Sequence, residues 1–178
     1  MIPAVDFLSL VAEIRRQAAH ADSTVHGEAH WRAVAWTYLD LVPLVPGADA
    51  EVGLLFGLCH DAMREHDGHD PDHGPRAAAM VRTLAAEGLL ALESDRLRTL
   101  ARAIENHTGG PPTSHPTIGL CQDADRLNLW RCSVRPDPRF LSTVAAREPA
   151  RIALHQSLPG QHESWAALHA RALELGAS

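Results

Sequence analysis

Lysine is missing from this chain of 178 residues, and all 16 of its basic residues are arginine. The absence excludes Schiff-base chemistry and catalysis by a lysine general base, because both need a lysine amine. Cysteine is also scarce: Cys59, Cys121 and Cys132 are an odd number and show no paired spacing. That pattern argues against a disulfide framework or a zinc knuckle, so we expect Cys59 and Cys121 to be small core residues.

Long apolar runs are missing too, because no segment approaches the roughly 20 apolar residues that span a bilayer. The first residues, Met1 to Asp6, show neither the basic stretch nor the cleavage site of an export signal, so a cytoplasmic location is expected. The net charge of −6 gives no support to broad nucleic-acid binding. With 46% hydrophobic and 21% charged residues, residues 1–178 are expected to form one globular domain.

Apolar residues recur at helical spacing along most of the chain, and no alternating run is convincing enough to predict a strand. Breaks rich in proline and glycine separate the helical segments. The sequence therefore predicts an all-α, single-domain helical bundle, in which C-terminal helices within 137–178 pack on a core of about 26–131. The expected helices are Val5–Ala19, His30–Val42, Ala50–Met63, Pro75–Gly88, Ser94–Asn106, Thr117–Arg131 and Glu163–Leu175.

The pair His60-Asp61 is the most informative feature that is present. It ends the strongly apolar run from Val52 to Cys59, which belongs in a core, and an aspartate is almost never buried without compensation of its charge. A divalent metal compensates it economically, because carboxylate and imidazole are both metal ligands. A hydrogen-bonded core histidine beside a helix-capping aspartate would leave further histidines and acids at helical positions unexplained. The additional candidate ligands are His30, His73, His107 and Asp125.

The ordered set resembles the signature of the HD-domain metal-dependent phosphohydrolases, which is His, then His-Asp, then Asp on separate helices of an all-α bundle. The motifs that carry the resemblance are His30-Trp31-Arg32-Ala33-Val34, then His60-Asp61, then Asp123-Ala124-Asp125-Arg126-Leu127. The resemblance spans about residues 26–131. The metal ligands that it implies are His30, His60, Asp61 and Asp125.

Two positions in this set have a competitor. The family's first histidine usually precedes Arg-Val by two residues, whereas an alanine interrupts that pair here, so His26 is an alternative to His30. His30 is favoured because the amphipathic helix is established there and Gly27 makes position 26 a helix entry. Asp125 is favoured over Asp123, which matches the family motif less well. Residues two apart lie about 200° apart around a helix, so both cannot face one metal.

Whether the site binds one metal ion or two depends on the roles of His73 and His107. His73 opens a helix and resembles the histidine of the His-Pro-x-x-Gly-Ala helix in binuclear relatives such as the HD-GYP enzymes, and His107 resembles the family's later histidine. We expect both to line the pocket, because two consecutive antiparallel helices bring the start of the first beside the end of the second. They are either ligands of a second metal or acid/base and substrate-binding groups. No Gly-Tyr-Pro follows, which disfavours cyclic dinucleotide cleavage.

The resemblance implies hydrolysis of a small phosphate ester or nucleotide by a metal-activated water. A site of mixed nitrogen and oxygen ligands suits one or two ions of Mn, Fe, Co or Ni, with Mg or Zn as alternatives. Two other functions stay open. A few proteins of this fold use a binuclear iron site for oxidative cleavage, which would make His73 and His107 ligands. The other is a non-catalytic, metal-dependent binding module, which the complete ligand set disfavours.

The residues around the ligands have expected roles as well. Asp61 is expected to bind metal and orient the attacking water. Arg64, about one helical turn later, is expected to contact phosphate unless it pairs with an acid of the following loop. That loop, residues 64–74, is expected to rim the pocket, with Asp67 and Asp70 in solvent. Arg126 is expected to pair with a nearby carboxylate.

Overall fold

The computed structural model describes residues 6–177, and within this range it is helical and contains no strand. The predicted all-α fold is confirmed. None of the described helices has the length and apolar character needed to span a bilayer. The predicted helix start at Val5 lies outside the described residues, as does most of the Met1–Asp6 segment. The α-helices are α1 (Phe7–Gln17), α2 (Glu28–Leu41), α3 (Ala50–Cys59), α4 (His73–Ala86), α5 (Ser94–Glu105), α6 (Pro116–Leu127), α7 (Val144–Arg147), α8 (Pro149–Leu154) and α9 (Trp165–Gly176).

Two helix boundaries differ from the prediction in a way that matters for the site. α3 ends at Cys59 instead of Met63, so His60 is its C-cap and Asp61 lies in the following turn. The segment predicted as one helix over 117–131 is α6 followed by a 3-10 helix. The short 3-10 helices are η1 (Val42–Leu44), η2 (Asn128–Cys132), η3 (Pro138–Phe140) and η4 (His155–Ser157).

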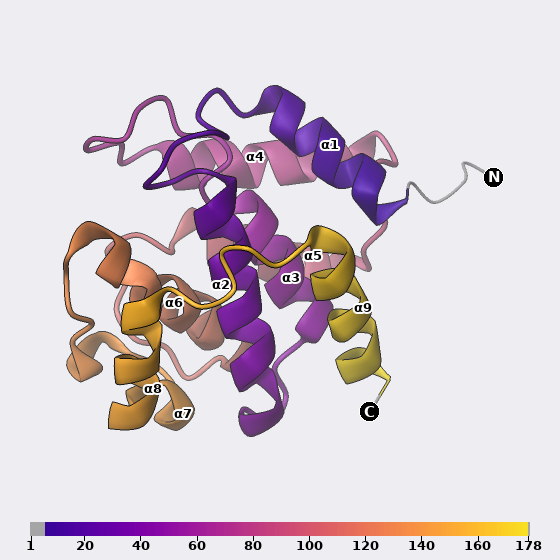
Figure 1. Ribbon diagram of the computed structural model, residues 1–178. Helices are drawn as coiled ribbons and strands as arrows, with labels where there is room; N and C mark the ends of the chain where they lie inside the picture. The colour runs from indigo at the N-terminus through magenta and orange to yellow at the C-terminus, as the bar shows by residue number, and fades with distance from the viewer. Residues whose placement is uncertain (1–5, 178) are drawn as a thin grey trace.

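α3 is the centre of the core. All but one of its ten residues are buried, and a helix that is apolar on every side has to be covered all round. It packs against α2, α5, α6 and α9 (Figure 1). Two glycines let α2 approach it closely: a Cβ at Gly53 would lie 2.0 Å from the Tyr38 ring, and one at Gly57 would lie 2.6 Å from Ala35 Cβ. This close crossing sets His60, at the end of α3, beside α2.

α4 and α5 pack as an antiparallel pair, and the start of α4 touches the end of α5. A Cβ at Gly74 would lie 2.9 Å from the carbonyl oxygen of Ile104 and 3.1 Å from that of Glu105. Backbone atoms cannot swing aside as a flexible side chain can, so glycine is needed for this close approach. The contact brings His73 beside His107, as expected for consecutive antiparallel helices.

The C-terminal segments pack on two sides of this core. α9 contacts α1, α2 and α3, whereas α7 contacts α6, and Figure 1 shows α9 and the α6–α8 group on opposite sides of α2. Asp123 of α6 holds the segment that leads into α7. Its carboxylate accepts the N–H of Ser142 at 2.6 Å, the N–H of Thr143 at 2.7 Å and the Thr143 hydroxyl at 2.8 Å. Asp123 therefore anchors the chain and points away from the predicted ligands.

Candidate metal centre

Six ionisable side chains converge in one buried region, which we call the His/Asp cluster. They come from α2, the C-cap of α3 and the turn after it, the start of α4, the turn after α5, and α6. All six were singled out in the sequence, and none has a side chain more than 15% exposed. The members of the cluster are His30, His60, Asp61, His73, His107 and Asp125.

The first group of the cluster is His30, His60 and Asp125. The Nε2 atoms of the two histidines lie 3.2 Å apart. Asp125 Oδ1 lies 3.2 Å from His30 Nε2 and 3.9 Å from His60 Nε2. This oxygen is buried, and no described residue gives it a hydrogen bond. The three ligand atoms lie within 4.8 Å of one another, close enough to hold a metal ion.

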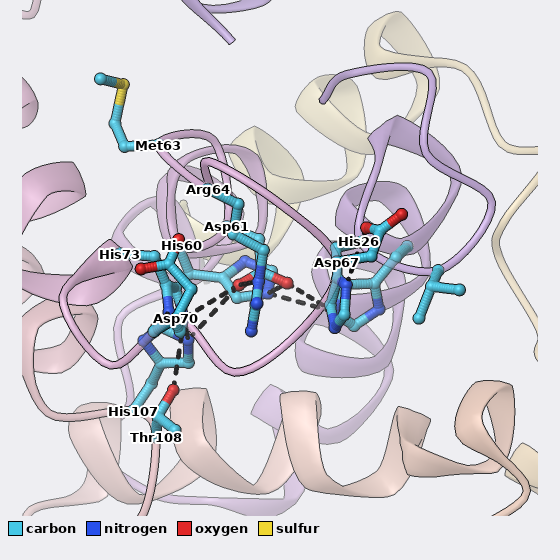
Figure 2. Close-up of polar contacts among 12 residues, drawn as sticks. His26, His60, Asp61, Met63, Arg64, Asp67, Asp70, His73, His107 and Thr108 are labelled. Carbon is cyan, nitrogen blue, oxygen red and sulfur yellow. Dashed lines mark hydrogen bonds and ion pairs between the residues drawn. The ribbon is translucent and has the colours of Figure 1, made fainter. Parts of the chain in front are cut away.

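Asp61 forms the second group together with His73 and His107, and it also connects this group to the first. Its Oδ1 lies 3.2 Å from His73 Nε2 and 3.6 Å from His107 Nε2. Its Oδ2 lies 3.5 Å from His30 Nε2 and 3.6 Å from His60 Nε2. Figure 2 shows the His73 and His107 rings turned toward Asp61. One carboxylate thus presents an oxygen to each group, the arrangement with which a carboxylate can bridge two ions.

Backbone carbonyls fix the orientation of three of the imidazoles. In each of the three, Nδ1 contacts the carbonyl oxygen of the residue three positions earlier, at 3.1 Å for His60 and 2.6 Å for His107, and likewise for His73. A carbonyl oxygen only accepts hydrogen bonds, so each Nδ1 carries the hydrogen. In a neutral ring the Nε2 lone pair then faces the cluster, as a metal ligand requires.

His73 and His107 pose an electrostatic problem that a cation solves. Their Nε2 atoms lie 2.9 Å apart, so the neutral rings would turn two lone pairs toward each other at hydrogen-bond distance. Either a proton or a metal ion relieves that repulsion. Burial opposes protonation of His107, but the Asp61 carboxylate outweighs burial and raises the pKa of His107. The surroundings of these two rings favour positive charge, and the residues present fit a metal ion.

The remaining pKa shifts leave the cluster rich in unprotonated ligands. Burial lowers the pKa of His30 to about 4 and that of His60 to about 3, so both rings are neutral at pH 7. Burial alone would raise the pKa of Asp61, but the surrounding imidazoles hold it well below its usual value. The pKa of Asp125 is likewise lowered against burial by His30 and Arg131. Two carboxylates therefore stay charged among imidazoles.

Two arginines flank the carboxylates of the cluster. Arg64 Nε donates to Asp61 Oδ1 at 3.0 Å, so Arg64 pairs with the cluster and not with an acid of the loop. Arg131, in η2, places Nη2 3.5 Å from Asp125 Oδ1. Arg131 was not among the residues predicted from the sequence. Its position depends on the change from α6 to a 3-10 helix, which the apolar pattern does not indicate.

His26 lies at the edge of the cluster, outside both ligand groups. Its Nδ1 lies 3.1 Å from Asp67 Oδ1, and its ring centroid lies 6.5 Å from that of His30. His30, and not His26, therefore lies in a group that could hold a metal ion. Asp67 is exposed, as expected, and it also accepts the Ser23 hydroxyl at 2.6 Å, so it connects the loop after α3 to the segment before α2.

Two expectations about single residues are wrong. Asp70 was expected in solvent but is buried, because its carboxylate accepts a backbone N–H of its own loop at 3.0 Å and pairs with Arg76 at 2.6 Å. Arg126 was expected to pair with a carboxylate. It donates instead to the backbone carbonyls of Phe140, at 2.5 Å, and of Gly110, because it lies on the side of α6 that these segments cover.

Comparisons with known proteins found no relative with which this geometry can be compared. No protein-family model matches the chain, and neither a curated protein nor a solved structure matches it. The family resemblance drawn from the ordered motif therefore stays a prediction. The candidate metal centre rests on the chain's own residues and on the distances among them.

Proposed function

We propose that this protein is a metal-dependent phosphohydrolase of the HD-domain type that acts on a small phosphate ester or nucleotide. The observation that carries the proposal is the position of Asp61, whose two oxygens face two groups of buried ligands. The order of the ligands along the chain, on separate helices of an all-α fold, supports the same family. The burial of the ligands and the presence of four imidazoles among them also support a metal site over a solvated acidic patch.

The ligand set suits two ions per chain. His30, His60 and Asp125 would hold the first ion, and His73 and His107 the second, with Asp61 shared between them. Imidazoles and carboxylates together suit Mn, Fe, Co or Ni, and Zn and Mg less well. Metal bound here would supply a water activated for attack and would polarise a phosphoryl oxygen.

The chain's own groups would bind and orient the substrate. Arg64 stands beside Asp61 and Arg131 beside Asp125, so a phosphate brought to the cluster would meet a guanidinium on either side. Guanidinium groups bind phosphate oxygens through charge-assisted hydrogen bonds, which would set the phosphorus in line with the cluster. Thr108 adds a hydroxyl 3.3 Å from His73 Nε2, at the second group.

Elemental analysis and a substrate panel test the proposal. The purified protein should carry about two transition-metal ions per chain, and phosphate release from a panel of nucleotides and phosphate esters should stop with EDTA and return with Mn²⁺, Fe²⁺ or Co²⁺. Asp61→Asn should lower turnover at least about 100-fold, because the shared carboxylate is lost. His162→Ala, at an exposed histidine outside the cluster, should leave turnover unchanged. Full activity of Asp61→Asn would contradict the proposal.

The same preparations separate the alternatives. Bound iron together with O₂-dependent oxidation, and no phosphate release, would favour a di-iron oxygenase. The presence of the second ligand group supports this alternative, because a di-iron site needs His73 and His107 as additional ligands. Metal binding with neither phosphate release nor O₂ consumption would favour a metal-dependent binding module.

A further inference from the structure

His30 differs from the other histidines of the cluster. Its Nδ1 is buried, and nothing in residues 6–177 hydrogen-bonds to it. The carbonyl three residues earlier, which contacts Nδ1 in the other three imidazoles, makes no such contact with His30 Nδ1. The Gly27 carbonyl accepts the backbone N–H groups of His30 at 2.9 Å and Trp31 at 3.1 Å, and the His26 carbonyl accepts the Trp31 indole N–H at 2.6 Å. A buried ring nitrogen needs a partner, so His30 Nδ1 requires one from another source.

Asn128, the first residue of η2, offers a matching acceptor. It is fully buried, and its Nδ2 donates to Thr37 Oγ1 at 2.9 Å and to the Ala124 carbonyl at 2.8 Å. Both hydrogens of the amide are thus used. Turning the amide over would set its oxygen against the Ala124 carbonyl, so its orientation is fixed. Asn128 Oδ1 is then left buried with no partner in the described part of the chain.

One small pocket is lined by both side chains. Its volume is about 30 Å³, and its lining includes His30, Asn128 and Ala33. A space of this size holds a single water molecule when two or more polar groups face it. The His30 Nδ1–H and the Asn128 amide oxygen are complementary, because one water can accept from the first and donate to the second.

We propose that one buried water molecule bridges His30 Nδ1 and Asn128 Oδ1, and that Asn128 is thereby a positioning residue for His30. The water does for His30 what a backbone carbonyl does for the other three imidazoles: it keeps the hydrogen on Nδ1 and leaves Nε2 as the ligand atom. Without this acceptor the hydrogen is better placed on Nε2, where Asp125 accepts it and where it competes with a metal. The functional meaning of the bridge rests on the proposed metal site.

Crystal structures of the wild-type protein and of Ala33→Val, at about 1.5 Å resolution, test the bridge itself. The wild type should show an ordered water within hydrogen-bond distance of both atoms, and Ala33→Val, which fills the cavity without changing Asn128 or His30, should lack it. Asn128→Leu removes the acceptor directly, and Ala33→Val keeps the test open if Asn128→Leu does not fold. A dry cavity in the wild-type crystal overturns the inference whether or not the protein binds metal.

Titration with Mn²⁺ tests the positioning role without reference to turnover. Ala33→Val and Asn128→Leu should weaken binding at the first ligand group by about 10- to 100-fold, the usual effect of losing a group that orients a ligand. Binding at the His73–His107 group should be unchanged, whereas a general loss of folding would weaken both. Thr37→Ser, which keeps the oxygen that orients the Asn128 amide, should bind as the wild type does. Equal Mn²⁺ affinity in all four proteins overturns the positioning role. A wild-type protein that binds no Mn²⁺ contradicts the proposed function. The crystal structures still decide in that case whether the bridging water is present.

Discussion

His73 Nε2 lies 2.9 Å from His107 Nε2, although 34 residues separate the two histidines along the chain. The antiparallel packing of α4 on α5 produces this contact, and Gly74 permits it by leaving room for the Ile104 carbonyl. Both rings are held by carbonyl groups three residues earlier, so neither can turn its Nε2 away without losing a hydrogen bond. Replacing both histidines and counting the bound metal therefore tests how many ions the cluster holds.

The double variant His73→Ala, His107→Ala should reduce the metal content from two ions per chain to one. The first ligand group keeps its two histidines and Asp125, so one ion should stay bound. Elemental analysis after dialysis against a weak chelator measures the count. One ion in the wild type and in the variant, with turnover lost, would instead indicate a mononuclear site in which the two rings act on substrate. Unchanged metal and unchanged turnover would remove both residues from the site.

Gly74→Ala should destabilise the fold and weaken the second ligand group. The new methyl would lie 2.9 Å from a backbone oxygen of α5, so α4 has to move outward, at a cost of about 1–3 kcal/mol in the free energy of unfolding. Urea denaturation measures the loss. The matched control is Gly176→Ala, near the end of α9, where an added methyl meets nothing within 4 Å. Equal stability of the two variants would show that the α4–α5 contact is looser than described.

Asp61→Asn should abolish the thermal stabilisation that metal gives. A ligand that binds only the folded state at 100 times its dissociation constant stabilises by about 2.7 kcal/mol, so Mn²⁺ should raise the melting temperature of the wild type by several degrees. The variant loses the charge that both groups share and should show little rise. Asp95→Asn, at a side chain 85% exposed, is the control and should respond as the wild type does.

Asp49 should make stability depend on pH in the acid range. Its carboxylate caps α3 by accepting the Val52 N–H at 3.1 Å, and it accepts two hydrogen bonds of 2.7 Å from Arg96. Burial would raise the pKa of Asp49, but Arg96 and the cap outweigh burial and lower it. Because the unfolded pKa is about 3.9, the stabilisation is complete above that pH and is lost as the pH falls through the lower, folded pKa.

Two substitutions separate the cap from the charge of Asp49. Asp49→Ala should lower the free energy of unfolding at pH 7 by about 1–2 kcal/mol. Asp49→Asn keeps the cap and should cost less than about 1 kcal/mol, because Arg96 is 36% exposed and water screens the ion pair. Urea denaturation at pH 7 and pH 3 should show the gap between wild type and Asp49→Asn shrinking at the lower pH. A gap that is the same at both values would mean that the ion pair contributes nothing.

Helical periodicity was enough to predict the fold class, whereas the members of the cluster were predicted from the resemblance of the ordered motif to the HD-domain signature. The apolar run that ends in His60-Asp61 has to be buried, and the negative charge of the buried carboxylate then has to be compensated, wherever the other helices lie. The antiparallel order of two consecutive helices was likewise enough to expect His73 near His107. The burial of His60-Asp61 and the closeness of His73 to His107 could be expected from the chain's own pattern, without a relative.

The residues that were missed depend on contacts that spacing does not encode. Arg131 and Asn128 follow α6 in a segment whose apolar pattern continues as a helix, whereas the backbone narrows to a 3-10 helix at Asn128 and redirects both side chains. Asp70 lies in a polar loop that composition assigns to solvent. Its partner Arg76, in α4, becomes a neighbour only through the tertiary fold.

The cluster takes its ligands from α2, α3, α4, α5 and α6 or from the turns that end them. Two ions that share Asp61 would together connect five segments that are far apart along the chain. Amide hydrogens whose exchange requires any of these segments to open would then be slowed together, because opening one would mean releasing a bound ion. Supply of the metal would in that case govern how long the protein resists proteolysis, in addition to how fast it works.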